Sequence, residues 1–371
     1  MITWLKKNIQ GDKIIWLIAI ILSAISLLSV YSATGSLAYQ KMGGNTEYYL
    51  FKHFVLIILS LLAMWFSHKL DYKYYSKISQ VGLYISLPLL LFTYKFGLNI
   101  NEASRWINIP IINQAFQPSD LAKLSLIIYL SSFLAKKQNY LDDIKILITP
   151  FIWIGLICLF IALTNLSTAL ILGATSLLLM FISRVKIKQL SLLVIFIIFS
   201  GGIALITGQR GTTALNRAEN FINKKDIPFQ LEQAYIAVST GGFFGKGPGK
   251  SNQKNFLPQS YSDFIYAIII EEYGFIMGIS IIILYLILLY RGLKIFIKSD
   301  RPFGGLLSAG LSFALIIQAM INMCVVVGLL PVTGVTLPLI SMGGTSQLFT
   351  GITLGIILSV SRQNKLEESY V

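Results

Sequence analysis

Long, uninterrupted apolar runs are the feature that most restricts the fold of this chain. Hydrocarbon offers backbone N–H and C=O groups no hydrogen-bond partner, so a run of about 20 apolar residues crosses a membrane as an α-helix. The runs are too long for barrel strands. They predict an all-α integral membrane protein, one domain of residues 1–371 with ten transmembrane helices, near 14–33, 50–67, 79–97, 120–135, 145–163, 167–183, 188–207, 263–290, 304–327 and 341–361.

The composition excludes a soluble globular domain, because 55% of the residues are hydrophobic and only 12% are charged. The formal net charge of +14 does not indicate nucleic acid, since the location of each basic residue matters more in a membrane protein. Cys158 and Cys324 lie in separate apolar runs, and His53 and His68 lie at the two ends of one run. This spacing indicates neither a disulfide framework nor a Cys or His metal cluster. The first run, long enough to span and without a convincing cleavage site, is expected to be retained as a helix.

The distribution of Lys and Arg predicts the orientation of the helices. The opposite short loops carry few basic residues, chiefly Lys41, Lys95 and Arg105. By the positive-inside rule, the basic side is the cytoplasm and both termini lie there. That side carries Lys6, Lys7, Lys13, Lys69, Lys73, Lys77, Lys136, Lys137, Lys145, Arg184, Lys186, Lys188, Arg291, Lys294, Lys298, Arg301, Arg362 and Lys365.

One large extracytoplasmic loop, residues 208–262, is basic all the same, and long loops can cross a membrane despite their charge. It carries Arg210, Arg217, Lys224, Lys225, Lys246, Lys250 and Lys254. The cluster is either a solvated face or a site for an anionic lipid headgroup such as a pyrophosphate, since Lys and Arg form charge-assisted bonds with phosphate oxygens. Its glycine tract, Gly241 to Ser251, lacks the spacing of a nucleotide-binding loop.

Polar residues also precede the fourth predicted helix. The stretch Ser104 to Ile107 is followed by Gln117 to Lys123. Ser119 is predicted to cap the helix, with Asp120 in its first turn and Lys123 one turn further on the same face. A capped helix with a snorkelling lysine explains this pattern as well as a binding role does.

The stretch Leu257 to Phe264 leads into the eighth predicted helix. Asp263 is expected in its first turn, where an acid complements the helix dipole. At the membrane face, beside a basic loop, the same carboxylate could take a proton from a sugar hydroxyl while cations hold a leaving pyrophosphate. Glu271 and Glu272 are predicted about 12–14 Å further down the helix, inside the bilayer and paired or protonated, with Lys123 as a candidate partner.

The last polar stretch is rich in Pro and Gly and runs from Gly328 to Ser346, after Asn322. Regular helix is not expected there, and non-helical backbone at membrane depth is tolerated only where it is buried in protein or lines a cavity. It is either a re-entrant turn without chemistry or the lining of a substrate groove.

These four stretches, in this order among the apolar runs, resemble the SEDS family, whose members include FtsW, RodA and SpoVE. The resemblance covers essentially the whole chain. The segment Ser251 to Pro258 is more similar to FtsW than to RodA and favours septal synthesis. Asp120 stands where the family usually has Glu, and Asn165 stands where Asp is common, which puts a proton or cation role of that position in doubt. The family motifs are Arg105-Trp106-Ile107, Gln117-Pro118-Ser119-Asp120 with Lys123, Leu257-Pro258 with Ser262-Asp263-Phe264-Ile265, Glu271-Glu272-Tyr273-Gly274, and Gly328-Leu329-Leu330-Pro331 to Gly343-Gly344.

The resemblance implies a peptidoglycan glycosyltransferase in the bacterial cytoplasmic membrane, at the division septum. It would transfer a glycan chain from an undecaprenyl-pyrophosphate carrier to lipid II on the extracytoplasmic face. Asp263 is carried over as the essential aspartate, acting as general base or as ligand of a divalent cation, Mg²⁺ or Mn²⁺. A single carboxylate is thin evidence for that metal. Substrate-binding candidates are Arg105, Asp120, Lys123, Arg217, Lys246, Lys250, Lys254, Ser262, Glu271 and Glu272.

The resemblance also implies partners: a class B penicillin-binding protein transpeptidase and other membrane proteins of the division complex. Three alternatives stay open, namely a lipid II flippase, an elongation polymerase like RodA, and a scaffold that only recruits the transpeptidase. A flippase needs polar groups along the whole crossing path. The cytoplasmic halves of the predicted helices are largely apolar, which favours the enzyme.

Overall fold

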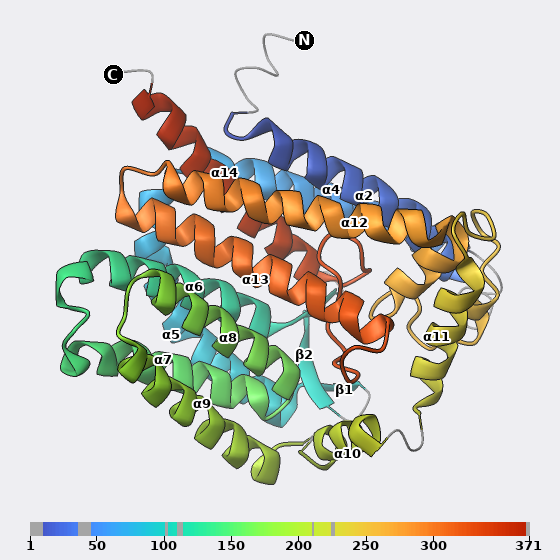
Figure 1. The fold of residues 1–371 in the computed structure, drawn as a ribbon, viewed down its shortest axis with the longest axis horizontal. Helices are drawn as coiled ribbons and strands as arrows, with labels where there is room; N and C mark the ends of the chain where they lie inside the picture. The colour runs from blue at the N-terminus through green and yellow to red at the C-terminus, as the bar shows by residue number, and fades with distance from the viewer. Residues whose placement is uncertain are drawn as a thin grey trace.

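The computed structural model describes residues 10–35, 46–100, 103–109, 114–209, 211–223 and 227–368. Within these ranges, ten helices of at least 17 residues each overlap one of the ten predicted runs (Figure 1). Lys6, Lys7, Lys41, Arg210, Lys224 and Lys225, used above for orientation, lie outside the described residues. The ten helices are α2 (Lys13–Ala33), α4 (Thr46–Lys69), α5 (Tyr72–Phe96), α6 (Pro118–Lys136), α7 (Ile144–Ala162), α8 (Leu166–Ile182), α9 (Ile187–Thr207), α12 (Ile265–Ile297), α13 (Pro302–Val326) and α14 (Thr345–Glu368).

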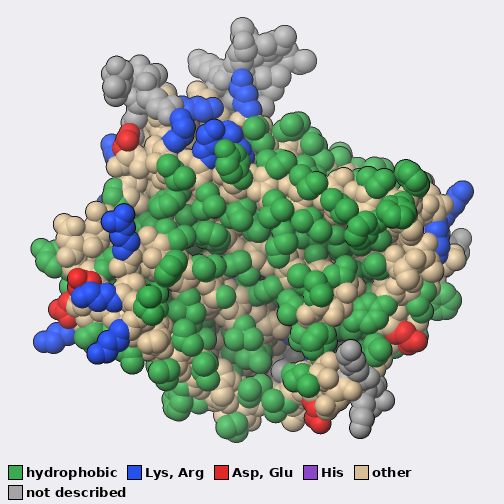
Figure 2. Space-filling view, viewed as in Figure 1, with side chains coloured by type: hydrophobic (Ala, Val, Ile, Leu, Met, Phe, Trp, Pro, Cys, Tyr) green, Lys and Arg blue, Asp and Glu red, His purple; other side chains and the backbone are tan. Residues whose placement is uncertain are grey.

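Six of these helices, α2, α4, α7, α9, α12 and α13, meet by length and apolar composition the requirement for crossing a membrane. Their outward faces are apolar as well: on α9, Ile198 and Phe199 expose 67% and 65% of their surface. Figure 2 shows a broad apolar face with most Lys and Arg side chains toward its edges. So large an apolar surface is incompatible with water and fits a lipid environment. The chain is a multi-span helical membrane protein.

Close helix packing comes from small residues. Helix α14 lies along α4, where a Cβ atom at Gly351 would overlap the carbonyl of Ser60 and one at Gly355 would overlap the carbonyl of Met64. Helices pack in lipid through such small residues, because contact between backbones replaces the missing hydrophobic driving force. Helix α6 packs against both α5 and α13 and so links the two halves of the bundle.

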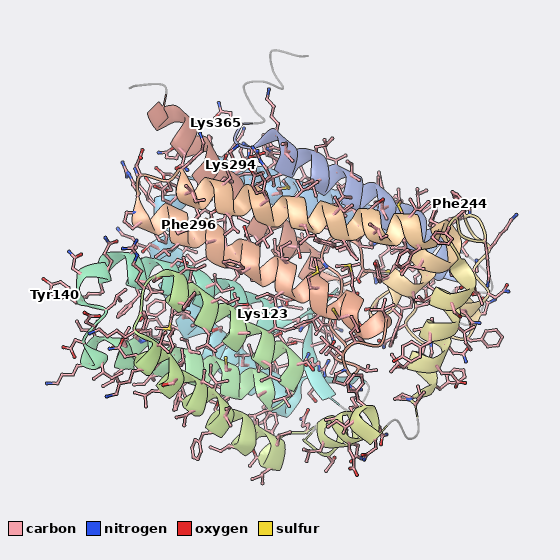
Figure 3. The ribbon with its side chains drawn as sticks, in the orientation of Figure 1. Lys123, Tyr140, Phe244, Lys294, Phe296 and Lys365 are labelled. Carbon is pink, nitrogen blue, oxygen red and sulfur yellow. The ribbon has the colours of Figure 1, made fainter. Side chains whose placement is uncertain are left out.

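The starts and ends of three helices meet at one end of the bundle. Asp12 caps α2 by accepting a hydrogen bond from the N–H of Ile14 at 2.9 Å, and Arg291 near the end of α12 donates its Nε to Asp12 at 2.7 Å. Lys365 near the end of α14 donates to the carbonyl of Gly11 at 2.8 Å. Figure 3 places Lys294 and Lys365 at this end. The first and last long helices therefore begin and end on the same side.

A small antiparallel sheet is a correction to the expectation of helices alone. Its strands β1 (Leu98–Ile100), β2 (Ala103–Ile109) and β3 (Gln114–Phe116) are ordered β1-β2-β3, with Leu98 opposite Trp106 and Ile107 opposite Phe116. The connection between α5 and α6 is too polar to cross a membrane, so its backbone groups are satisfied by strand pairing instead. Strand β2 carries Arg105 across the end of the helix bundle.

The predicted loop 208–262 is largely helical. It contains α10 (Gly211–Asn223) and α11 (Phe229–Gly241), followed by a 3-10 turn, η2 (Gln253–Asn255). A second 3-10 turn, η1 (Gln138–Tyr140), joins α6 to α7. Helix α11 packs along α12. The tight hairpin expected after the fifth run is confirmed, since α7 ends at Ala162 and α8 begins at Leu166, capped by the side chain of Asn165.

Helix α12 is a helical hairpin rather than one straight helix. Its backbone reverses at Gly274, where φ is 80° and ψ is 178°. The Tyr266 hydroxyl donates to the carbonyl of Gly278 at 3.1 Å, although 12 residues of continuous helix would separate these positions by about 18 Å. A short arm, residues 265–273, therefore folds back on a long arm, residues 275–297.

This reversal makes the predicted depth of Glu271 and Glu272 wrong. Both glutamates lie at the turn of the hairpin, where the N–H groups of Lys246 and Gly247 bond to their carbonyls at 2.9 Å. Residues 246–254 of the basic loop cover them. Figure 3 shows Phe244 beside this turn and Phe296 at the opposite end of the long arm. Asp263 lies before the short arm, at the end of this arm that is away from the turn.

We predict that Gly274→Ala destabilises the protein by more than about 2 kcal/mol. Backbone with this φ and ψ is essentially restricted to glycine. A Cβ atom here would also overlap the carbonyl of Phe243 and the N–H of Gly245. The measurement is the free energy of unfolding in detergent micelles.

The control for that variant is Gly201→Ala. Gly201 lies in α9 with helical backbone, and among the described residues no atom outside the neighbouring backbone of α9 lies within 4 Å of the place that an alanine methyl group would take. Alanine favours helix over glycine by about 1 kcal/mol, so this change leaves stability unaltered or slightly raised. Equal stability of the two variants would contradict the hairpin at Gly274.

Candidate functional site

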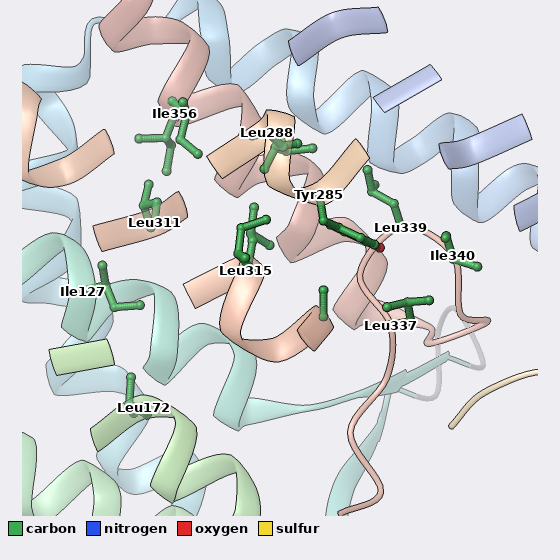
Figure 4. Close-up of a cluster of buried hydrophobic side chains, with 14 of the residues drawn as sticks. Ile127, Leu172, Tyr285, Leu288, Leu311, Leu315, Leu337, Leu339, Ile340 and Ile356 are labelled. Carbon is green, nitrogen blue, oxygen red and sulfur yellow. The ribbon is translucent and has the colours of Figure 1, made fainter. Parts of the chain in front are cut away.

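The expected non-helical segment between α13 and α14 is confirmed, and it is held by buried side chains. Gln318 donates to the carbonyl of Thr336 at 3.0 Å, and Asn322 donates to that of Val335 at 2.7 Å. Ser26 donates to the carbonyl of Ile340 at 2.6 Å, and the Tyr285 hydroxyl donates to that of Pro338. Figure 4 shows Leu337, Leu339 and Ile340 buried beside Tyr285. The segment is therefore a rigid wall inside the bundle.

Asp263 is positioned by this wall. Asn322 donates to its carbonyl at 2.9 Å, and Ser341 donates to the carbonyl of Ser262 at 2.6 Å. The N–H of Met342 bonds to the carbonyl of Tyr261 at 3.0 Å. The predicted first-turn position of Asp263 is wrong, since α12 begins at Ile265 with Phe264 as N-cap. Three consecutive residues of the turn are thus pinned to the non-helical segment.

The Asp263 carboxylate faces Gly334. Its Oδ1 accepts a hydrogen bond from the Ser262 hydroxyl at 3.0 Å, and its Oδ2 lies 3.5 Å from where a Cβ atom of Gly334 would stand. Burial, then Tyr49 and the charge of Asp263, raise the pKa of Tyr261 above its usual value. The phenol next to the carboxylate therefore stays protonated at neutral pH.

Arg105 approaches the same glycine from the sheet. Its Nη1 lies 3.9 Å from the Gly334 Cβ position, and its Nε donates to the carbonyl of Thr164 at 3.1 Å. A guanidinium and a carboxylate thus approach the same residue, and its φ of 65° is the left-handed backbone conformation that favours glycine. An arginine held beside the site can stabilise a developing negative charge there.

A cavity of about 190 Å³ extends from Arg105 toward helix α10. Arg217 of α10 borders it and donates to the carbonyl of Val332 at 3.2 Å. Asn165, whose side chain also caps α8, forms part of the wall. The structure thus brings Arg105 and Arg217 to one cavity. The contributions of Thr164 and Gly334 had no signal in the sequence, because the first acts through its carbonyl and the second through its backbone conformation.

Asp120 and Lys123 form an ion pair of 2.8 Å, as their spacing predicted, and border a different cavity of about 60 Å³ inside the bundle (Figure 3). The pairing of Lys123 with Glu271 or Glu272 is wrong. Ser119 as N-cap is also wrong, because Gln117 takes that place and Pro118 is the first helical residue. Asp120 Oδ2 is buried and accepts no hydrogen bond from the part of the chain that the structure describes. Since the two charges cancel, the pair presents little net field.

Glu271 is bound by the basic loop. The Lys246 ammonium contacts its Oε1 at 2.6 Å, the Ser251 hydroxyl donates to Oε2, and the N–H groups of Asn252 and Gln253 donate at 3.2 Å. Glu272 accepts from Ser32 of α2. Lys246 lies about 12 Å from Asp263 along the short arm of α12, so the structure does not bring them together.

The other two lysines of the loop also lie at this turn. Lys254 donates to the carbonyl of Gly249 at 2.7 Å and to Ser32 at 3.3 Å. Lys250 is exposed, and within the described residues it makes no ion pair. These lysines surround Glu271 and Glu272 rather than the Asp263 carboxylate.

A metal at Asp263 would have few protein ligands. Within the described residues, no three His, Cys, Asp or Glu side chains converge. A divalent cation there would take one carboxylate from the chain, with Ser262 beside it, and its other oxygen ligands from substrate phosphates or water. Mg²⁺ in phosphate-binding sites has that kind of ligand set.

The bundle, the buried non-helical segment and the carboxylate facing an arginine define a multi-span membrane protein with a polar site. The chain matches, over residues 12–366, a family model for FtsW, RodA and SpoVE that is described as "Cell cycle protein", and it belongs to that family. It is 33% identical to a "Probable peptidoglycan glycosyltransferase FtsW" of Geobacter metallireducens over 97% of each chain. It is 31% identical to "Stage V sporulation protein E" of Bacillus subtilis, over 97% of this chain and 99% of that one.

Solved structures share the fold. One chain of "Structural coordination of polymerization and crosslinking by a peptidoglycan synthase complex" superposes with a TM-score of 0.74 at 23% identity, over 95% of this chain and 98% of that one. The Rod shape determining protein RodA of Thermus thermophilus gives a TM-score of 0.70 at 22% identity, over 98% and 99%. The helix arrangement is therefore that of RodA.

We predict an energetic coupling of about 1–3 kcal/mol between Lys246 and Glu271 in a double-mutant cycle of Lys246→Met and Glu271→Gln. The Glu271 side chain is fully buried, and that of Lys246 is 28% exposed, so solvent screens the pair only partly. Free energies of unfolding of the four proteins in detergent provide the measurement.

Lys250→Met, cycled with the same Glu271→Gln, is the matched control. Lys250 lies in the same loop without contacting the glutamate, so its coupling should stay below about 0.5 kcal/mol. Equal coupling for both lysines would mean that the loop acts through its total charge and not through the observed contact.

Proposed function

We propose that this chain is a peptidoglycan glycosyltransferase that polymerises lipid II at the extracytoplasmic face of the bacterial cytoplasmic membrane. The observation that carries the proposal is the Asp263 carboxylate facing Gly334 together with Arg105, in a family whose relatives are named glycosyltransferases. A carboxylate accepts a proton, and an adjacent guanidinium binds phosphate. Glycosyl transfer from a lipid diphosphate needs both.

The proposed chemistry follows from these positions. The carboxylate of Asp263 takes the proton from the acceptor hydroxyl of lipid II as the oxygen of that hydroxyl attacks the anomeric carbon of the growing chain. The bond from that carbon to the diphosphate oxygen breaks, and the diphosphate leaves with the electron pair and its polyprenyl carrier. Arg105 and Arg217 border one cavity and stabilise the leaving charge there. Ser262 orients the base through its 3.0 Å hydrogen bond.

The proposal assigns the other candidates by position. Lys123 and Asp120 line the inner cavity as substrate-binding residues whose charges cancel. Lys246, Lys254, Glu271 and Glu272 hold the loop over the hairpin of α12, and the exposed Lys250 binds headgroups at its surface. Mg²⁺ or Mn²⁺ at Asp263 would neutralise the diphosphate.

The proposed setting is septal cell-wall synthesis, with ten membrane-spanning helices, both termini in the cytoplasm, and residues 208–262 outside. A class B penicillin-binding protein and further membrane proteins of the division complex would be the partners. The FtsW names of relatives and the peptidoglycan synthase complex that contains a structural neighbour support this setting.

A flippase is the second candidate function, since it too needs a lipid-accessible polar site. The position of Asp263 at one end of the bundle, beside the extracytoplasmic helices, favours the enzyme. A carrier would need polar side chains through the opposite half as well.

We expect purified protein, with its transpeptidase partner and labelled lipid II, to form glycan polymer, and Asp263→Asn to lose at least about a hundredfold of this rate. Loss of a general base costs about 10²–10⁴ in rate. The asparagine keeps the shape of the side chain, so gel analysis of the polymer measures the missing base and not misfolding.

Asp300→Asn is the matched control, because Asp300 is exposed in the turn between α12 and α13. It should polymerise at the wild-type rate. Normal polymerisation by Asp263→Asn would contradict the assignment of Asp263 as general base. Movement of lipid II between leaflets without polymer formation would favour the flippase. A reporter fused after residue 250 that proves cytosolic would overturn the orientation.

A further inference from the structure

Arg217 stands between two cavities of different character. The first, of about 190 Å³, is the cavity that it shares with Arg105 and Asn165. The second, of about 290 Å³, lies on the other side, between α10, α11 and the non-helical segment. Both are lined by Arg217, Pro331 and Val332. The Arg217 guanidinium thus lies between a cavity bordered by two arginines and a neighbouring cavity that, among the described lining residues, it alone supplies with a charge.

The second cavity is mainly apolar. Apart from Arg217 and Asn220, its lining consists of aliphatic and aromatic groups and Gly328, namely Phe221, Ile227, Pro228, Leu231, Tyr235, Pro331 and Val332. Gly328 has φ of 80°, and a Cβ atom there would lie 2.7 Å from the Tyr235 hydroxyl. Glycine at this position therefore allows the Tyr235 ring to lie against the backbone. The volume is about twice that of a roughly 150 Å³ apolar cavity that holds one benzene molecule. It is large enough for a short length of hydrocarbon chain.

We propose that this apolar cavity binds the part of the polyprenyl chain next to the diphosphate of the donor substrate, with the diphosphate at Arg217 and Arg105. The inference rests on the proposed function and deepens it. A lipid diphosphate has an anionic group joined directly to an apolar chain, and the two cavities present cations and apolar walls in that same order. Charge complementarity at Arg217 selects this occupant over an uncharged apolar segment.

The position of α10 supports a lipid ligand. This helix exposes Leu215 and Ile222 by 54% and 76%, whereas Arg217, Asn220 and Phe221 line the cavities. A helix with charged and apolar faces lies in the membrane interface, where the diphosphate of a membrane-anchored substrate also lies. A chain leaving the bilayer can therefore reach the cavity without crossing water.

The test measures binding without turnover, in the Asp263→Ala background reconstituted in nanodiscs. The two probes are radiolabelled undecaprenyl diphosphate and inorganic pyrophosphate, which has the same anionic group and no chain. We expect Phe221→Ala to weaken undecaprenyl diphosphate about five- to tenfold, the effect of losing roughly 50 Å² of apolar contact, and to leave pyrophosphate unchanged. Arg217→Gln should weaken both probes.

Ile222→Ala is the matched control, since Ile222 is the next residue of α10 and does not line the cavity. It should bind both probes as the parent does. Ile227→Trp, at a half-exposed position of the lining, narrows the cavity without touching the core and should weaken undecaprenyl diphosphate alone.

Equal effects of Phe221→Ala and Ile222→Ala, or a loss of pyrophosphate binding with Phe221→Ala, would overturn the inference. An unchanged affinity for undecaprenyl diphosphate in Phe221→Ala and Ile227→Trp would do the same and leave the cavity to a bilayer phospholipid or a partner helix. The proposed function fails separately, when the wild-type protein makes no polymer.

Discussion

The structure depends on hydrogen bonds from buried side chains to the carbonyls of the segment between α13 and α14. Lipid cannot donate hydrogen bonds to those carbonyls. Non-helical backbone inside the bundle is therefore stable only because side chains of the protein donate them. Gln318, Asn322, Tyr285 and Ser26 supply four donors from α13, α12 and α2. Asn322 also bonds to the carbonyl of Asp263. The bonds that make the segment tolerable in a membrane are therefore the same bonds that place the carboxylate.

Glycine at position 334 completes this arrangement. Asp263 and Arg105 approach it from two elements far apart in sequence, the turn before α12 and strand β2. The φ of 65° at Gly334 is a conformation that favours glycine, and it sets the course of the backbone between the two side chains. The non-helical segment thus provides both the buried hydrogen bonds and the turn that the site requires.

The sequence predicts the bundle well because the apolar runs and the membrane thickness determine helix positions almost independently of tertiary contacts. Gly274 shows where that reasoning stops. Apart from Glu271 and Glu272, residues 265–290 are mainly apolar, and single glycines are common in transmembrane helices, so Gly274 itself does not mark a reversal. Glu271 and Glu272 carry the missing signal: two carboxylates deep in a bilayer are costly, and a turn that returns them to a basic loop removes the cost. The strands around Arg105 were not predicted for a related reason, since strands of three and seven residues are too short to show a clear alternation of apolar and polar residues.

The composition of the site follows the same logic. Its charged residues could be chosen from the sequence, because ionisable side chains at the ends of apolar runs are few. Their grouping could not, since the spacing gives no distance between Arg105, Arg217 and Asp263. The structure separates the eleven candidates into three places: Asp263 with Ser262 and the two arginines, the neutral pair Asp120–Lys123, and the lysines around Glu271 and Glu272. Around Asp120 and around the two glutamates, acids offset the cations, with the exposed Lys250 as the exception.

At the Asp263 site, two guanidiniums stand against one carboxylate, and hydrogen bonds to the carbonyls of Thr164 and Val332 orient the guanidiniums. The cavity that the arginines border therefore keeps a net positive charge, which is the electrostatic character that an anionic leaving group requires.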